Sequence, residues 1–187
     1  LEGGAIISHD EATKKRIDNL KNFGFVNETT VVAPGINSKM NEVQAALGLV
    51  QLKHHHENIE KRKNIAKIYR QRLNDISGIA CLPEPEKTES NYAYFPILID
   101  EQLYGISRDQ LYEKLKENGI FGRRYFYPLI SDFSMYKSLD SAKPSNLSVA
   151  KSIAEKVVCL PLYSHLATET IVDICNLIYN VQNFNSH

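Results

Sequence analysis

The sequence predicts an α/β fold in which short strands alternate with helices, and two observations indicate it. From residue 93 to residue 181, apolar runs of strand length alternate with longer runs whose apolar residues recur at helical spacing. Before them, residues 40–74 contain no proline and one glycine, and their apolar residues also recur at helical spacing. We therefore expect one long helical segment followed by a small domain of strands and helices.

The N-terminal residues are expected to form a strand, a helix and a loop. Residues 5–8 read as a short strand, and Asp10 is a suitable N-cap for a helix over residues 10–22. Gly24 follows that helix and helps to end it. Residues 25–39 show no periodicity, and irregular segments of this length are often functional.

The long helical segment changes character midway. Residues 45–50 are small and apolar on nearly all sides, so we expect them to be buried on several sides. The second half is strongly charged and should expose one face. A break is expected near residues 54–58, because a long helix whose burial changes midway often joins two bodies.

The remaining elements follow from periodicity and from capping residues. Ser107 and Thr168 are suitable N-caps, and Gly119 is suited to end a helix. Residues 132–145 are expected to form a loop. Strands are expected at residues 93–99, 120–127 and 158–162, and helices at residues 107–118, 147–157 and 168–181.

The composition excludes several classes of protein. The chain has 187 residues, of which 43% are hydrophobic and 24% charged, as in ordinary globular domains rather than disordered, collagen-like or coiled-coil chains. Lys plus Arg equals Asp plus Glu at 22, and this zero net charge argues against a general nucleic-acid or anionic-membrane binder. No signal peptide opens the chain, and its apolar runs are far shorter than the ~20 residues that span a bilayer.

Neither the cysteines nor the histidines indicate a metal site or a disulfide framework. Cys81, Cys159 and Cys175 are an odd, sparse set in apolar surroundings, so we expect buried thiols in a reducing cytoplasm. The three histidines of residues 54–56 are adjacent. Adjacent side chains on a helix point about 100° apart and cannot converge on one metal ion.

A candidate anion site precedes the long helix. Asn37 or Ser38 could cap the helix start, whose free N–H groups favour an anion such as phosphate. Lys39 adds a positive charge. The alternative is simply a capped helix without a ligand.

A second candidate site is the sequence Arg-Arg-Tyr-Phe-Tyr-Pro at residues 123–128. Guanidinium groups suit phosphates, and aromatic rings suit the face of a base or sugar. On a strand, Arg123, Tyr125 and Tyr127 would point to one side, with Arg124 and Phe126 on the other. The alternative is an edge strand that merely packs its aromatic side chains.

Taken together, the motifs resemble the C-terminal half of the DegT/DnrJ family of sugar aminotransferases over nearly the whole chain. The most specific block precedes and enters the long helix. The motifs are, in order, Glu2-Gly3-Gly4-Ala5; Gly35-x-Asn37-x-Lys39-Met40-Asn41-Glu42-x-Gln44-Ala45-Ala46-Leu47-Gly48-Leu49; Arg62-Lys63 with Tyr69-Arg70 and Leu73; Gly119-Ile120 with Tyr127-Pro128; and Leu160-Pro161-Leu162.

The resemblance implies a PLP-dependent enzyme of fold type I that works as a homodimer with shared active sites. Such enzymes move an amino group, usually from glutamate, to a keto nucleotide sugar, and the sequence at residues 123–128 resembles the branch that acts on 3-keto or 4-keto deoxyhexoses linked to dTDP. The family's Schiff-base lysine lies several residues before Glu2 and is absent from this sequence, as is the aspartate that faces the pyridine nitrogen. We therefore expect no catalytic residue here and no transamination by the chain alone.

The resemblance also assigns binding residues. Asn37 matches the asparagine that reaches the partner subunit's cofactor phosphate, and Lys39 stands where the family has Lys or Arg near that phosphate or the substrate. Tyr127 matches the tyrosine near the sugar-nucleotide pocket. Many members have His immediately before it, whereas this chain has Phe126, so Arg123 or Arg124 would supply the charge.

The resemblance implies three regions: residues 1–39 as the tail of the large cofactor domain, residues 40–77 as connecting helices and residues 78–187 as a small domain with a short, mostly antiparallel sheet. The chain begins with Leu1 rather than Met, which suggests a fragment made by design or by proteolysis. The alternative function is a non-catalytic remnant that binds a sugar nucleotide or a full-length aminotransferase. A chain cut here would expose the apolar face of residues 45–50 and self-associate through it.

Overall fold

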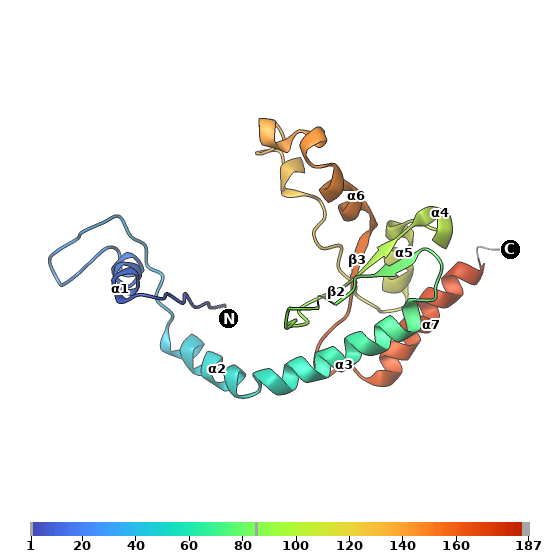
Figure 1. The fold of residues 1–187 in the computed structure, drawn as a ribbon, viewed down its shortest axis with the longest axis horizontal. Helices are drawn as coiled ribbons and strands as arrows, with labels where there is room; N and C mark the ends of the chain where they lie inside the picture. The colour runs from blue at the N-terminus through green and yellow to red at the C-terminus, as the bar shows by residue number, and fades with distance from the viewer. Residues whose placement is uncertain (1, 85, 185–187) are drawn as a thin grey trace. The chain divides into compact units, whose positions relative to one another are not determined.

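A computed structural model describes residues 2–84 and 86–184 (Figure 1). The chain divides into two compact units, Leu1–His55 and His56–His187. The first contains α1 (Glu11–Leu20) and α2 (Glu42–Lys53). The second begins within α3 (His55–Leu73) and contains all of the strands found in the described residues.

The first unit is a helix with a loop folded back against its C-terminal end. Asp10 caps α1, as predicted, by accepting a hydrogen bond of 2.7 Å from the Thr13 amide. The loop returns through hydrogen bonds such as that from the Ile36 amide to the Leu20 carbonyl, 2.9 Å. Gly24 has a φ of +84°, and a Cβ there would lie 1.8 Å from the Ala33 carbonyl oxygen, so only glycine fits.

Two predictions for this unit are wrong. Residues 5–8 form no strand, because no neighbouring segment offers them a ladder of hydrogen bonds. Neither Asn37 nor Ser38 caps α2: the helix begins at Glu42, and Asn41 caps it in a capping box with Gln44. The predicted break in the long helix is confirmed, because α2 ends at Lys53, His54 is its C-cap and α3 begins at His55.

The expected burial of α2 is also wrong within this chain. No residue of α2 is buried, and Val43, Leu49 and Leu52 are each more than half exposed. One helix and one loop offer too little surface to cover a helix on all sides.

The second unit is built on a three-stranded antiparallel sheet in the order β1 (Ile79–Cys81), β2 (Phe95–Ile99), β3 (Val157–Leu160). Ile97 in the central strand pairs with Cys81 on one side and with Val158 on the other. The side chains of β2 alternate between buried and half-buried, as expected for a strand with one face on the core. The expected short antiparallel sheet is thus confirmed.

Helices α3, α5 (Arg108–Glu117) and α7 (Thr168–Phe184) complete the core around the sheet. Two phenols tie distant segments together: Tyr69 Oη donates to the Pro161 carbonyl, 3.0 Å, and Tyr104 Oη to the Ile178 carbonyl, 2.6 Å. Burial raises the pKa of both phenols. The largest fully buried residues include Tyr69, Leu73, Ile97, Ile99, Tyr104, Leu111, Leu115, Ile171, Ile174 and Ile178.

Most of the remaining elements lie where they are predicted. Helix α5 is capped by Ser107, and α6 (Ser148–Lys156) runs directly into β3. Helix α7 begins at Thr168, so Thr168 is its first residue rather than its cap. Strand β1 and the short helix α4 (Glu101–Tyr104) are additions.

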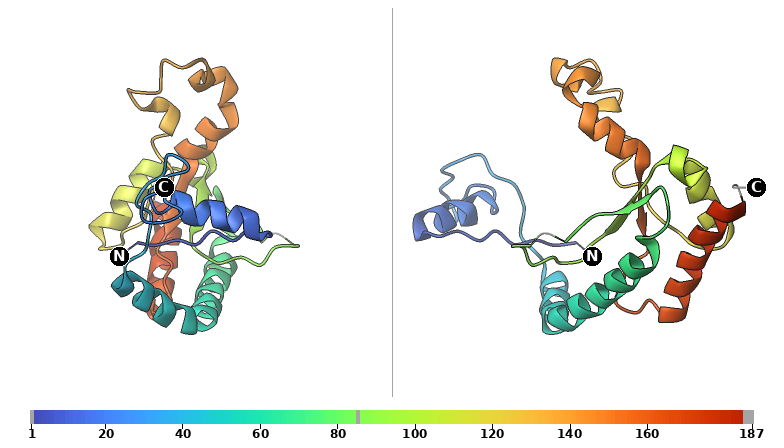
Figure 2. Two further views of the ribbon diagram at one scale, coloured as in Figure 1. Left: turned by 90° about the vertical axis from the view of Figure 1, so that its left-hand side faces the viewer. Right: turned by 45° about the vertical axis from the view of Figure 1, so that its right-hand side comes forward.

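The segment from Gly119 to α6 departs most from prediction. Residues 120–127 form no strand; a single bridge joins Arg123 to Cys159 beside β3. The expected loop that follows contains three 3-10 turns, Ile130–Asp132, Asp140–Ala142 and Pro144–Asn146. Figures 1 and 2 show that these turns and α6 project away from the sheet.

The described residues contain neither a helix with the length and apolarity to cross a membrane nor a cluster of three metal-ligating side chains. The three cysteines are free thiols, with Cys159 and Cys175 buried and Cys81 half-buried.

Candidate functional site

The predicted site residues fall into two groups, one in each unit. Asn37 and Lys39 lie in the loop of the first unit. The second unit holds Arg123, which pairs with the edge of the sheet, and then Arg124, Tyr125 and Tyr127, which follow it.

The loop of the first unit holds Asn37 and Lys39 against the end of α1. Asn37 pairs with Asn22 in an isolated antiparallel bridge. Lys39 Nζ donates a hydrogen bond of 2.7 Å to Asn22 Oδ1 and lies 5.9 Å from the centroid of the Phe23 ring. An ammonium group has three donors, so two remain for another acceptor. The Asn37 side chain is exposed and, within residues 2–84 and 86–184, has no hydrogen-bond partner.

Arg123 anchors the second group to the sheet. Its amide donates to the Cys159 carbonyl, 3.0 Å, and the Cys159 amide donates back to the Arg123 carbonyl, 2.7 Å. Gly122 permits this approach, because a Cβ there would lie 3.1 Å from the Cys159 carbonyl oxygen. The chain then leaves the edge of β3, so the side chains that follow no longer alternate as on a strand.

Arg123 and Tyr125 belong to an aromatic cluster with Tyr94 and Phe126. The Tyr125 and Phe126 rings stack with centroids 4.9 Å apart, and Tyr94 meets Tyr125 edge-on at 5.4 Å. The guanidinium of Arg123 lies 5.9 Å from the Tyr125 centroid, and no acidic side chain pairs with it among the described residues. Tyr94 and Phe126 are more than half exposed, so this cluster offers solvent an aromatic surface beside a cation.

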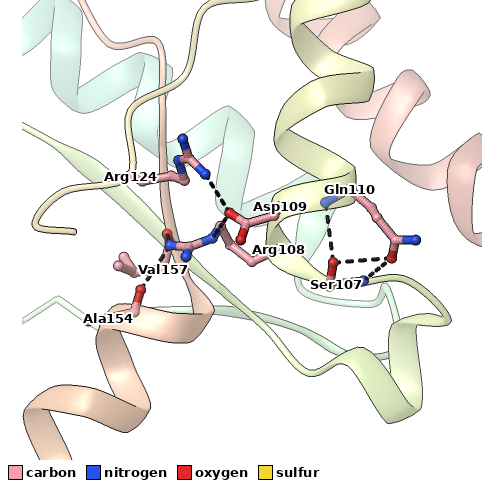
Figure 3. A network of polar contacts seen from close by, with 7 residues as sticks. All are labelled: Ser107, Arg108, Asp109, Gln110, Arg124, Ala154 and Val157. Atoms are coloured by element: carbon pink, nitrogen blue, oxygen red, sulfur yellow. Dashed lines mark hydrogen bonds and ion pairs between the residues drawn. The ribbon is translucent and has the colours of Figure 1, made fainter. Parts of the chain in front are cut away.

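Arg124 belongs instead to an ionic network at the start of α5 (Figure 3), and the Tyr127 ring lies against the arginines of that network. Arg108 is only 4% exposed, and its Nη1 donates to the carbonyls of Ala154, 2.8 Å, and Val157, 2.9 Å. The Arg108 guanidinium carbon lies 4.6 Å from the centroid of the Tyr127 ring. The start of α5 thereby contacts both the end of α6 and the predicted substrate residue Tyr127.

Asp109 joins the two arginines of this network. Its Oδ1 lies 2.7 Å from Arg108 Nε and accepts a hydrogen bond of 2.8 Å from Arg124 Nη1. Arg124 also lies over the Tyr112 ring, at 4.4 Å from its centroid. Partial burial by itself raises the pKa of Asp109, but the hydrogen bond from Arg124 and the charges of both arginines outweigh it, so the pKa is lowered. The carboxylate is therefore ionised at neutral pH.

The predicted alternation of residues 123–127 is wrong beyond Tyr125. Tyr125 stacks on Phe126 instead of opposing it, and Tyr127 lies with Arg124 rather than with Arg123. The two predicted arginines therefore have different surroundings: Arg123 is exposed beside the aromatic cluster, and Arg124 is held by Asp109.

Sequence reasoning missed Tyr94, Arg108 and Asp109. A signal for Arg108 was present, because it follows the N-cap Ser107 directly, and a cation in the first turn opposes the helix dipole. Such a placement indicates that another interaction stabilises the charge. Tyr94 gives no such signal, since an aromatic residue before a strand is ordinary.

Comparison with known proteins identifies relatives over nearly the whole chain. The DegT/DnrJ/EryC1/StrS aminotransferase family matches residues 1–179. The chain is 56% identical over 178 residues to dTDP-4-amino-4,6-dideoxy-D-glucose transaminase of Escherichia coli, covering 95% of this chain and 48% of that protein. It is 41% identical over 182 residues to the protein of the same name from Shigella dysenteriae, covering 97% and 49%.

Solved structures share the fold. A protein described as sugar aminotransferase Spr1654 from Streptococcus pneumoniae, in its PMP form, matches with a TM-score of 0.84 at 25% identity, covering 96% of this chain and 45% of that one. This confirms the expected fold as part of a fold type I aminotransferase. The chain spans about half the length of the relatives that it matches.

Proposed function

Because the chain belongs to the DegT/DnrJ/EryC1/StrS aminotransferase family, we propose that it is the C-terminal portion of a PLP-dependent enzyme that transfers the amino group of glutamate to a keto-deoxy sugar linked to dTDP. The 56% identity to the E. coli dTDP-4-amino-4,6-dideoxy-D-glucose transaminase carries this proposal and favours the 4-keto over the 3-keto sugar. We place the reaction in the cytoplasm, whose reducing environment maintains free thiols such as the three found here.

We assign residues 1–39 to the cofactor domain, residues 40–77 to connecting helices and residues 78–187 to the small domain. The break between α2 and α3 lies within residues 40–77 and supports two connecting helices there: α2 has no buried residue, whereas α3 packs into the core.

The proposed cofactor contact is made by Asn37 and Lys39. The exposed Asn37 amide and the two remaining donors of Lys39 fit a phosphate group, although neither residue lies at a helix N-terminus. PLP, when bound, supplies an electron sink and carries the amino group. The role of this chain would be to hold the phosphate of a partner subunit's cofactor, in a homodimer with shared active sites.

The proposed substrate contacts are made by Arg123, Arg124, Tyr125 and Tyr127. The guanidinium of Arg123, which has no acidic partner in residues 2–84 and 86–184, is best placed to bind a phosphate oxygen of the nucleotide, with the Tyr125 ring beside it for the base or sugar. Arg124 uses one of its five N–H donors on Asp109 and keeps the others for a second phosphate oxygen. The Tyr127 ring, half exposed, would border the sugar.

The residues assigned here would bind ligands and would not carry out the chemical step. All of the assigned residues bind or orient, and none of them abstracts the proton that amino transfer requires. The chain alone is therefore expected to be inactive. The non-catalytic alternative is a protein that binds a sugar nucleotide or a full-length aminotransferase without catalysing a reaction.

A chimera tests the proposal directly. Residues 2–179 replace the matching segment of the E. coli relative, and transfer of nitrogen from 15N-glutamate to dTDP-4-keto-6-deoxyglucose is followed by mass spectrometry. We expect the chimera to form the 4-amino sugar, whereas the 187-residue chain forms none and a dTDP-linked 3-keto sugar reacts poorly.

The controls separate the two functions. A chimera with Arg123→Ala should require more nucleotide sugar for half-maximal rate, and one with the exposed Lys137→Ala should not. A folded, cofactor-loaded chimera that leaves the 4-keto sugar unconverted would contradict the enzyme proposal. Only if such an inactive chimera were combined with dTDP binding by the 187-residue chain would the results favour the non-catalytic alternative.

A further inference from the structure

We propose that Arg108 and Asp109 are positioning residues, which hold Arg124 and Tyr127 in the geometry that binds the nucleotide sugar. This inference rests on the proposed function and deepens it, because it names the residues that organise the substrate segment. Arg108 and Asp109 open α5, and their side chains point toward Arg124 and toward the end of α6 (Figure 3).

The placement of Arg108 is costly for stability alone. A buried guanidinium loses its hydration, and a cation in the first turn of a helix opposes the helix dipole. Arg108 recovers part of this cost through two hydrogen bonds to the carbonyls of Ala154 and Val157, where α6 ends. Apolar side chains often replace such buried ions without loss of stability. An apolar side chain at this position could not place a positive charge against the Tyr127 ring and beside Asp109, as Arg108 does.

Asp109 transmits the fixed position of Arg108 to Arg124. One oxygen, Oδ1, meets Arg108 Nε at 2.7 Å and Arg124 Nη1 at 2.8 Å. The Tyr112 ring lies against the other side of the Arg124 guanidinium. A free arginine loses side-chain entropy when it is ordered. If Asp109 and Tyr112 order Arg124 before the ligand arrives, less of that cost falls on binding.

The charge of Asp109 and its proposed positioning role predict opposite effects on the affinity for an anion. A carboxylate next to a phosphate-binding arginine repels phosphate, so by charge alone its removal should tighten binding of a nucleoside diphosphate. If Asp109 acts by positioning Arg124, its removal should weaken that binding. The lowered pKa of Asp109 keeps the carboxylate ionised at neutral pH, where the two explanations are compared.

The test uses dTDP as the probe and the 187-residue chain as the protein. Wild type, Asp109→Asn, Asp109→Glu and Glu113→Gln are titrated by calorimetry at pH 7.5. Glu113 is a control for charge alone, because it lies on the same helix, is exposed, pairs with Lys116 at 3.7 Å and acts on Arg124 only through its charge. We expect Asp109→Asn to raise the Kd for dTDP about fivefold to tenfold. Asp109→Glu should recover most of the affinity, and Glu113→Gln, which removes charge alone, should leave the affinity unchanged or slightly tighter.

A second readout is independent of the ligand. Nitrogen-15 spectra of the arginine side chains report whether the Arg124 guanidinium is restrained, and we expect Asp109→Asn to release it while Glu113→Gln does not. An unchanged Arg124 signal, or an unchanged or tighter Kd for dTDP in Asp109→Asn, would overturn the positioning role and leave the proposed function intact. A wild-type chain that does not bind dTDP would instead count against the proposed substrate residues and, with them, this inference.

Discussion

The two units of the chain differ in how far their apolar side chains are buried. In the second unit, α3, α5, α7 and the sheet bury a continuous core that includes Leu111, Leu115 and Ile97. In the first, α1 and α2 bury no residue, and the loop is held mainly by backbone hydrogen bonds, such as that from the Val32 amide to the Gly24 carbonyl, 3.0 Å. The second unit has the core of an independent domain, whereas the first leaves apolar surface that a partner would cover.

This difference matches the division of labour that we propose. The unit with its own core carries the proposed substrate residues, of which Arg123 is anchored to the sheet. The unit without one carries the residues assigned to a cofactor held by another subunit, so its stability and its function would both depend on assembly.

The largest expected effect lies in the core. Leu115→Ala removes a fully buried side chain from α5 and should lower the free energy of unfolding by about 2–5 kcal/mol. Leu49→Ala, on α2, removes a side chain that is 64% exposed and should change it by less than about 0.5 kcal/mol. Urea unfolding is followed by two signals: tyrosine fluorescence reports the second unit, because all ten tyrosines lie after His55 and tryptophan is absent, and far-UV circular dichroism reports the helices of both units. Equal losses in the two variants would erase the contrast between the units.

The second effect concerns α2 as a contact between two copies. We expect the chain to self-associate through α2, and Leu49→Lys should raise the dimer dissociation constant at least about tenfold, or ~1.4 kcal/mol. Leu103→Lys is the matched control, since Leu103 is equally exposed but lies on α4 in the second unit. Sedimentation velocity distinguishes the variants. A wild-type chain that stays monomeric at high concentration argues that α2 needs no partner copy.

The third effect compares two capping boxes of the same kind. Ser107→Ala should lower the free energy of unfolding of the second unit by about 1 kcal/mol, because α5 packs into its core. Asn41→Ala removes the same interaction from α2, yet it should leave the tyrosine-detected transition in place. Its effect should be local: faster hydrogen exchange of the Gln44 amide, which donates to Asn41 Oδ1. A shifted transition in Asn41→Ala would show that the units unfold together.

The smallest effect is on thiol chemistry within the second unit. Burial raises the pKa of all three thiols, that of Cys175 to about 11. Since only the thiolate reacts, labelling by Ellman's reagent at pH 8 should be slow and should speed up about tenfold per pH unit below the pKa. Half-buried Cys81 should react first. If Cys175 reacted as fast as Cys81, the core would open far more readily than its packing implies.

Local signals were sufficient for much of the fold. Residues within a few positions of one another determine several of its elements. These are the helix caps Asp10 and Ser107, the break at His54, and strands β2 and β3. The misplaced cap of α2 had a local cause too, because Asn37, Ser38 and Asn41 are all capping residues, and only the Gln44 partner distinguishes Asn41.

The site required contacts that the sequence does not display. Arg108 meets Ala154 across 46 positions, and Arg124 meets Asp109 across 15. Residues 120–127 are composed like a strand, but among the described residues only Arg123 forms a bridge to the sheet, and the expected alternation of side chains fails beyond Tyr125. The family resemblance pointed to residues 123–128, and the structure shows that Arg123 and Arg124 have different surroundings.

The most direct test of the central claim is to read the gene upstream of the Leu1 codon. If this chain is the C-terminal portion of an aminotransferase, an in-frame extension should encode a lysine several residues before Glu2, with an aspartate further upstream. A start codon immediately before Leu1, with no such extension, would contradict the enzyme assignment and leave a binding protein.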